Sequence, residues 1–177
     1  MLVYQDNGSV SVLTEVRFTI NRHEPLLAPL VPFVVTPEVS RHILDLKPAL
    51  SKIPGLSIDA REVAILVNGT IWKSAFEIWS HERIAVATTN LNQSQIDKIK
   101  AGDKPHDLDE ECSIAFDITT ELLKRPGPLS EELWKRAEKT LGTQGATALV
   151  HYIGYYSYVS IMQNGFDVPL PNGESVG

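Results

Sequence analysis

The sequence contains a single cysteine, Cys112, among 177 residues. An intrachain disulfide, a cysteine-rich zinc site and a C-x-x-C redox motif each need at least two cysteines, so all three are excluded. The lone thiol lies in a helical pattern, and we expect it to be a small core residue. So few cysteines also fit a reducing compartment, which favours a cytoplasmic location.

Clusters of basic residues and long apolar runs are missing as well. The 16 Lys and Arg residues are outnumbered by 22 Asp and Glu residues, which gives a formal net charge of −6. We therefore expect no binding to nucleic acid or to an anionic membrane surface. No apolar run is long enough to span a bilayer, and the N-terminus does not resemble a secretion signal. The expected partners are small molecules and other protein chains.

No regular alternation of strands and helices runs through the chain, and helical patterns dominate it. Residues 1–36 are rich in β-branched residues and then in proline, so we expect a non-helical N-terminal arm there. Residues 37–171 form the expected helical domain, and residues 172–177 form a C-terminal tail. The sequence thus predicts an all-α bundle preceded by an arm.

Cap and stop signals divide the domain into about seven helices. Asn68-Gly69 is typical of a helix end and of a tight turn, and Gly142 of another helix end. Ser57 or Asp59 is expected to cap the helix that ends at Asn68-Gly69. These signals predict one helix that begins at Pro37, one that ends at Gly69, and five more over residues 71–88, 91–102, 107–127, 129–142 and 143–166.

Three polar residues share one face of the helix predicted over residues 71–88. Ser74, Glu77 and His81 are spaced i, i+3 and i+7, which places them within roughly 60° of one another around the helix. A tight turn before this helix would fold the preceding one back as an αα-hairpin and bring Glu62 to the same face. A carboxylate beside a histidine orients the imidazole and raises its pKa, so this set is a candidate acid–base site. The alternative is a solvated pair on the helix surface.

A resemblance to a known family is carried by this same segment. "AREVAILVNGTIWKSAFEIWSHERIAVA", followed later by "LVHYIGYYSYVSIMQNGFDVPLP", resembles the carboxymuconolactone decarboxylase family within the alkylhydroperoxidase D-like superfamily. The similarity covers residues 37–171. The peroxidase branch has a glutamate, eleven residues, a cysteine, two residues, a cysteine, three residues and a histidine. Here Glu62, Ser74, Glu77 and His81 occupy those four positions.

The spacing is retained, but neither cysteine position holds a cysteine. Ser74 and Glu77 cannot form a disulfide or reduce a peroxide, so thiol peroxidase activity is not expected. The resemblance instead implies the decarboxylase-like branch, with an alkylhydroperoxidase D-like helical bundle and an inward-facing Glu77–His81 pair. It also implies a homo-oligomer, as dimer, trimer or hexamer, and neither a cofactor nor a metal, although Glu62, Glu77 and His81 are suitable metal ligands by type.

Several further residues are candidates for substrate binding, each with a plain packing role as the alternative. Ser74 is expected to donate a hydrogen bond to a substrate carboxylate. Trp72 and Trp79 are expected to form an apolar wall that excludes water. His151 and Tyr155 share a face of the last predicted helix and could line a pocket opposite His81.

The function that these observations and the resemblance imply is that of a cofactor-free lyase. It would act on a small carboxylated lactone, enol or polyketide-like substrate by decarboxylation, dehydration or isomerisation. His81 would deliver the proton, Glu77 would orient His81, and Glu62 would serve as the second carboxylate. The resemblance is closest to fungal-type members, some of which serve small-molecule biosynthesis. The alternative is a non-catalytic helical oligomer that binds a ligand or partner.

Overall fold

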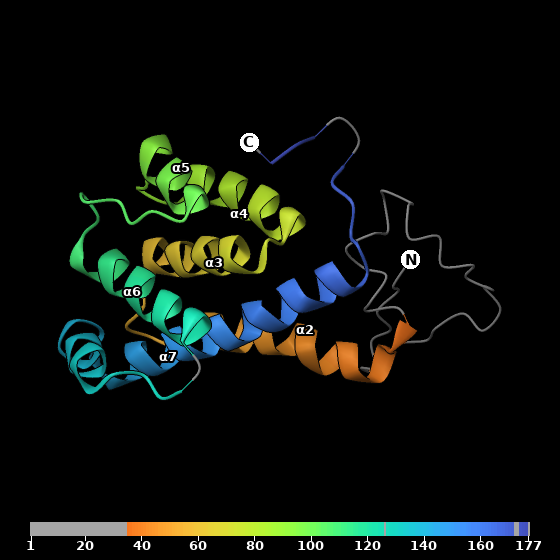
Figure 1. Cartoon of the computed structure of the whole chain (residues 1–177). Helices are drawn as coiled ribbons and strands as arrows, with labels where there is room; N and C mark the ends of the chain where they lie inside the picture. The colour runs from red at the N-terminus through yellow and green to blue at the C-terminus, as the bar shows by residue number, and fades with distance from the viewer. Residues whose placement is uncertain (1–34, 126, 172–173, 177) are drawn as a thin grey trace.

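Every helix or strand in the described part of the chain is an α-helix, so the predicted all-α class is confirmed. The computed structural model describes residues 35–125, 127–171 and 174–176, and the predicted N-terminal arm lies outside them except for Val35 and Thr36. Figure 1 shows the arrangement. The helices are α2 (Pro37–Ser51), α3 (Ile58–Trp72), α4 (Ala75–Thr88), α5 (Gln93–Ala101), α6 (Glu110–Lys124) and α7 (Glu131–Gly165).

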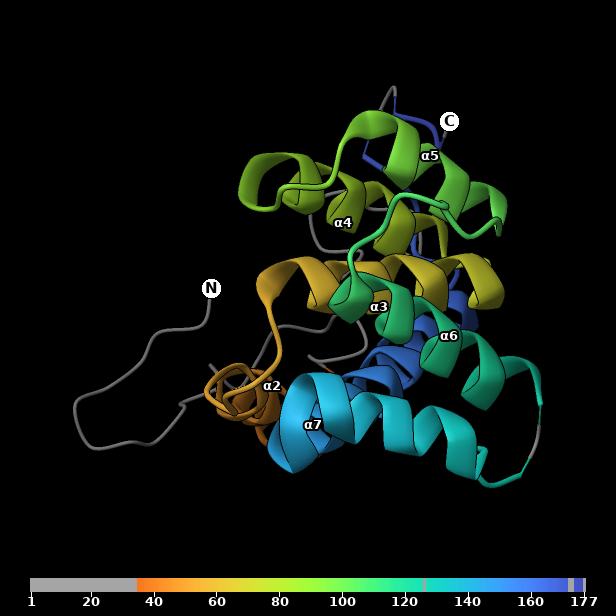
Figure 2. The ribbon, with the colours of Figure 1, turned by 90° about the vertical axis from the view of Figure 1, so that its left-hand side faces the viewer.

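Helix α3 is the centre of the bundle. It packs against α4 and α5 on one side and against α6 and α7 on the other, while α2 lies beside α7 (Figures 1 and 2). All residues from Glu62 through Gly69 are buried. A helix that is apolar on every side is stable only when it is covered on every side, which explains its central position. Glu62 is therefore a carboxylate at the core of the bundle.

The turn between α3 and α4 differs from the prediction. Helix α3 continues through Asn68-Gly69 to Trp72, the chain reverses at Lys73 with a φ of 54°, and α4 begins at Ala75 rather than near residue 71. A Cβ on Gly69 would lie 3.2 Å from Cγ1 of Ile78, so this glycine permits a close approach of α4. It is a packing position and not a helix end.

Asn68 is also used for packing rather than for a turn. Its side-chain Nδ2 donates hydrogen bonds to the carbonyl oxygen of Ile153, at 3.0 Å, and to Oγ of Ser157, at 2.9 Å. Both partners lie on α7. Because the amide is fully buried, these bonds satisfy a polar group that would otherwise be costly inside the bundle. They fix α7 against α3.

The last two predicted helices form a single element with a break. Helix α7 runs over 35 residues, and Gly142 within it has φ 67° and ψ 167°, which is not helical. The predicted helix end at Gly142 is confirmed: two helical segments meet there at a kink, and the label α7 covers both, so the described residues carry six labelled elements. Within the part of the chain that the structure describes, no helix combines the length and the apolarity needed to cross a bilayer.

The segment between α2 and α3 crosses α7 just after this kink. A Cβ on Gly145 would lie 2.1 Å from the carbonyl oxygen of Gly55, and Gly55 itself has a φ of +85°. Two backbones therefore touch where only glycine fits. This contact holds the start of α3 against α7.

We expect Gly145→Ala to destabilise the fold by roughly 3 kcal/mol, because the added methyl group has no space. Gly154→Ala is the matched control. Gly154 is also in α7, but a Cβ there would meet nothing within 4 Å, so it should be neutral or stabilising by up to about 1 kcal/mol. Urea unfolding of both variants measures the difference. A Gly145→Ala variant as stable as the parent would disprove the tight contact.

Candidate active site

The candidate residues Glu62, Glu77 and His81 meet in the interior. The reversal at Lys73 folds α4 back along α3, so that His81 in the middle of α4 lies beside Glu62 in the middle of α3. Nδ1 of His81 is 2.7 Å from Oε2 of Glu62, and Nε2 is 3.1 Å from Oε1 of Glu77. The three residues are only 7%, 4% and 5% exposed, for Glu62, Glu77 and His81 in turn. We call these residues the Glu–His–Glu triad.

The imidazole of His81 is charged at neutral pH. Burial is the largest single effect and lowers the pKa of His81, but the hydrogen bonds and charges of Glu62 and Glu77 together outweigh it. The net result raises the pKa from its ordinary value of 6.5 to about 9. An imidazolium carries a proton on both ring nitrogens, so each nitrogen donates to one carboxylate. The triad therefore holds a proton on His81, between the two buried carboxylates of Glu62 and Glu77.

Gln163, near the C-terminal end of α7, connects the triad to Ser74. Its Nε2 donates to Oε2 of Glu77 at 2.7 Å, and its Oε1 accepts from Oγ of Ser74 at 2.6 Å. Ser74 is fully buried and precedes α4, but its side chain does not cap that helix. The predicted Ser74 thus belongs to the site through Gln163, a residue that the sequence analysis missed.

A second missed residue, Tyr156, is the aromatic neighbour of His81. The two rings meet edge-on with centroids 5.1 Å apart. Burial raises the pKa of Tyr156, so its phenol stays neutral. Tyr156, Ser160 and Gln163 are spaced i, i+4 and i+7, and this polar stripe on a largely apolar helix was the available signal.

The remaining predicted residues lie farther from the triad or on the surface. Tyr155 is buried and packs edge-on against Tyr156, with ring centroids 5.2 Å apart. His151 is exposed. Trp72 is 37% exposed, and Trp79 lies partly buried beneath the guanidinium of Arg83, 4.4 Å from its ring centre. The ring that shields His81 is therefore that of Tyr156.

A polar cavity of about 240 Å³ lies at the N-terminus of α4. We call it the α4 cavity; it is lined by Lys73, Ser74, Ala75, Phe76, Gln163, Asn164, Asp167 and Val168. Its walls thus include Ser74 and Gln163 but none of the triad. The positive end of the α4 dipole and the charge of Lys73 favour an anion in this cavity, whereas the side chain of Asp167, also in the lining, opposes one. Gln163 separates it from Glu77.

The triad does not have the geometry of a metal site. Its carboxylates lie at opposite nitrogens of one imidazole ring and do not converge on a common point. Elsewhere in the described residues, no group of three or more His, Cys, Asp or Glu side chains is placed to hold a metal ion. Cys112 is buried on α6, and burial raises the pKa of its thiol, so it is an unreactive core residue as predicted.

Comparison with known proteins adds no relative. No family model matches the chain, and no curated protein sequence is significantly similar to it. The resemblance to the carboxymuconolactone decarboxylase family therefore stays a prediction that depends on the spacing of Glu62, Ser74, Glu77 and His81.

The shifted pKa of His81 predicts a specific pH dependence of stability. The pKa is about 9 in the folded chain and near 6.5 when unfolded, so the stabilisation is fully present below about pH 6.5 and is lost as the pH rises through about 9. His81→Asn should remove this dependence, whereas His106→Asn, at an exposed histidine, should retain it. Urea unfolding between pH 6 and 10 tests this. Parallel curves for the parent and His81→Asn would contradict the buried imidazolium.

Proposed function

We propose that the protein is a cofactor-free lyase that transfers protons between the Glu–His–Glu triad and a small carboxylated substrate. The observation that carries the proposal is the charged, buried His81 with a carboxylate at each ring nitrogen. Such an arrangement keeps a proton ready at neutral pH in a site that excludes water. The resemblance to the carboxymuconolactone decarboxylase family points to the same chemistry.

The geometry favours Glu77, rather than His81, as the group that meets the substrate. Both nitrogens of His81 are occupied by carboxylates, so the ring has no free atom for a ligand. Glu77 uses Oε1 for His81, and its other oxygen, Oε2, accepts from Gln163 at the edge of the α4 cavity. Glu77 is then the terminal acid, His81 supplies its proton, and Glu62 holds the other side of the imidazole. This reverses the two roles expected from the sequence.

In the proposed decarboxylation, the bond between the carboxyl carbon and its neighbour breaks and CO2 leaves. The electron pair moves into an adjacent carbonyl or vinylogous system as an enolate. Glu77, having taken the Nε2 proton of His81, protonates the carbanion and returns to a carboxylate. A proton from water then restores the imidazolium, so one proton replaces one CO2. Dehydration and isomerisation would use the same proton transfers.

The α4 cavity is the proposed binding place for the substrate. A carboxylate there would meet the positive end of α4 and the ammonium of Lys73, which together must outweigh the repulsion from Asp167 in the same lining. The amide of Gln163 must turn away for the substrate to reach Oε2 of Glu77, and Ser74 would then be free to donate to the substrate. The substrate class remains that of small carboxylated lactones, enols and polyketide-like acids.

A second candidate is a non-catalytic helical oligomer. The specific observation in its favour is that the triad is closed: its residues bond to one another and to Gln163, and none of the three lines the α4 cavity. We also propose that the chain forms a homo-oligomer, whether catalytic or not. Large apolar side chains are exposed on several helices, among them Val39, Leu44 and Leu46 on α2, and Val150 and Ile161 on α7.

The catalytic proposal predicts that Glu77→Gln and His81→Asn each reduce turnover at least ~100-fold, because each removes a step of the proton path. Cys112→Ala and Glu132→Gln, at an exposed carboxylate, should keep full activity. CO2 release from a panel of small carboxylated lactones and β-keto acids is the measurement, with unfolding curves to confirm that the variants fold. Activity of the parent should fall as the pH rises through about 9, where His81 loses its proton.

Two outcomes would count against this proposal. Full activity in both triad variants would show that the triad is not the proton source. A parent protein without turnover on the whole panel, together with a defined oligomer in light scattering, would favour the non-catalytic candidate.

A further inference from the structure

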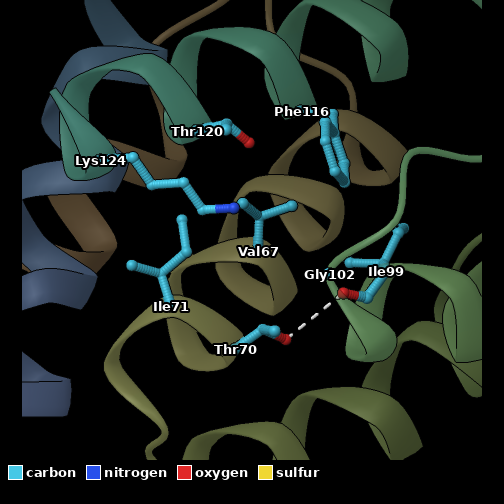
Figure 3. A pocket seen from close by; sticks show the side chains of 8 residues that line it. All are labelled: Val67, Thr70, Ile71, Ile99, Gly102, Phe116, Thr120 and Lys124. Carbon is cyan, nitrogen blue, oxygen red and sulfur yellow. Dashed lines mark hydrogen bonds between the residues drawn. The ribbon is translucent and has the colours of Figure 1, made fainter.

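A second cavity lies on the other side of α3, away from the triad. It has a volume of about 120 Å³ and is formed between α3, α5 and α6 (Figure 3). We call it the α3–α6 cavity; its lining is Val67, Thr70, Ile71, Ile99, Gly102, Phe116, Thr120 and Lys124. Four of these residues, Val67, Ile71, Ile99 and Phe116, provide an apolar interior.

The rim of this cavity is polar and positively charged. In Figure 3 the side chain of Lys124 runs back from the last turn of α6 across the cavity, with its Nζ above Ile71 and near Val67. The hydroxyl of Thr120 lies on the same side, whereas that of Thr70 is already bonded to the carbonyl oxygen of Ile99, at 3.5 Å. Two polar groups thus remain available for a ligand.

Lys124 is one of six described lysines without an ion pair, and it alone among them lines this cavity. Lys100, Lys104 and Lys135 each lie within 3.0 Å of a carboxylate oxygen. Among the described residues, no carboxylate pairs with Lys124. Its ammonium is therefore a free positive charge directly beside an apolar hollow.

We propose that the α3–α6 cavity binds a short-chain monocarboxylate, with its apolar tail inside and its carboxylate on Lys124 and Thr120. The size fits this class, since apolar cavities of about 150 Å³ accept benzene, so one of 120 Å³ suits a tail of about four carbons. A compact inorganic anion such as phosphate would leave the apolar walls empty and lose its hydration. This site is independent of the triad and of the proposed lyase activity.

Titration of the full-length, methyl-labelled protein with isovalerate tests the proposal by NMR. Saturable shifts are expected for the methyl groups of Val67, Ile71 and Ile99, with a Kd on the order of 1–10 mM, as a ligand of this size allows. Isovaleramide has the same shape without the charge and should bind more weakly. The absence of saturable shifts at these methyl groups up to about ten times that Kd would overturn the site. Equal affinity for the amide would overturn the role of Lys124.

Two variants test separately the charge of Lys124 and the space inside the α3–α6 cavity. Lys124→Gln should weaken isovalerate binding roughly 2- to 5-fold, as expected for an exposed ion pair, and Lys139→Gln, at an exposed lysine elsewhere, should not. Thr120→Leu should fill the cavity and abolish binding, while its melting temperature confirms the fold. An unchanged Kd in Lys124→Gln, or an equal loss in Lys139→Gln, would contradict the proposal, and so would full binding by Thr120→Leu.

Discussion

The structure depends on one buried imidazolium held between two carboxylates. Removing three ionisable groups from water is costly, and the cost is offset only because Nδ1 and Nε2 of His81 each meet an acid at hydrogen-bond distance. The loss of either acid would leave charge uncompensated in the core. A well-packed apolar trio would often be at least as stable, so stability alone does not account for the triad.

The packing of α3 follows from the need to enclose this site. Glu62 lies on a helix whose other buried positions are mostly apolar, so α4 and α7 must both approach α3 closely to shield it. Gly69 allows the approach of α4, and Asn68 ties α7 to α3 through two buried hydrogen bonds. The same contacts bring Tyr156 edge-on to His81 and Gln163 onto Glu77. The contacts that bring α4 and α7 close to α3 are thus the same contacts that set the geometry of the site.

The sequence predicted those parts of the site that depend on local spacing. The Glu77–His81 pair is an i,i+4 contact within one helix, and Glu62 follows from an αα-hairpin, so both were accessible to helical periodicity. Ser57 was one of two predicted caps, with Asp59 as the alternative, and its side chain accepts from the backbone nitrogen of Ala60. The Asn68-Gly69 turn was wrong because its signal is local, while Asn68 is used for contacts 85 and 89 positions away. Gln163 was missed for the same reason, since its partner Glu77 is 86 positions away.

In the proposed lyase, Gln163 would be the link between the closed triad and the substrate. Its amide gives Glu77 a neutral donor, and a hydrogen bond to a charged acceptor contributes about 1.5–3 kcal/mol. A substrate that offers its own donor to Oε2 replaces this bond with little net cost, and the bonds from His81 to Glu62 and Glu77 stay in place. The same movement would release Ser74 from Gln163, and the hydroxyl of Ser74 would then donate to the substrate instead of to Oε1 of Gln163. The proposed exchange would therefore favour ligands that present both a donor and an acceptor at the edge of the α4 cavity, and the proton would stay on His81 when no such ligand is bound.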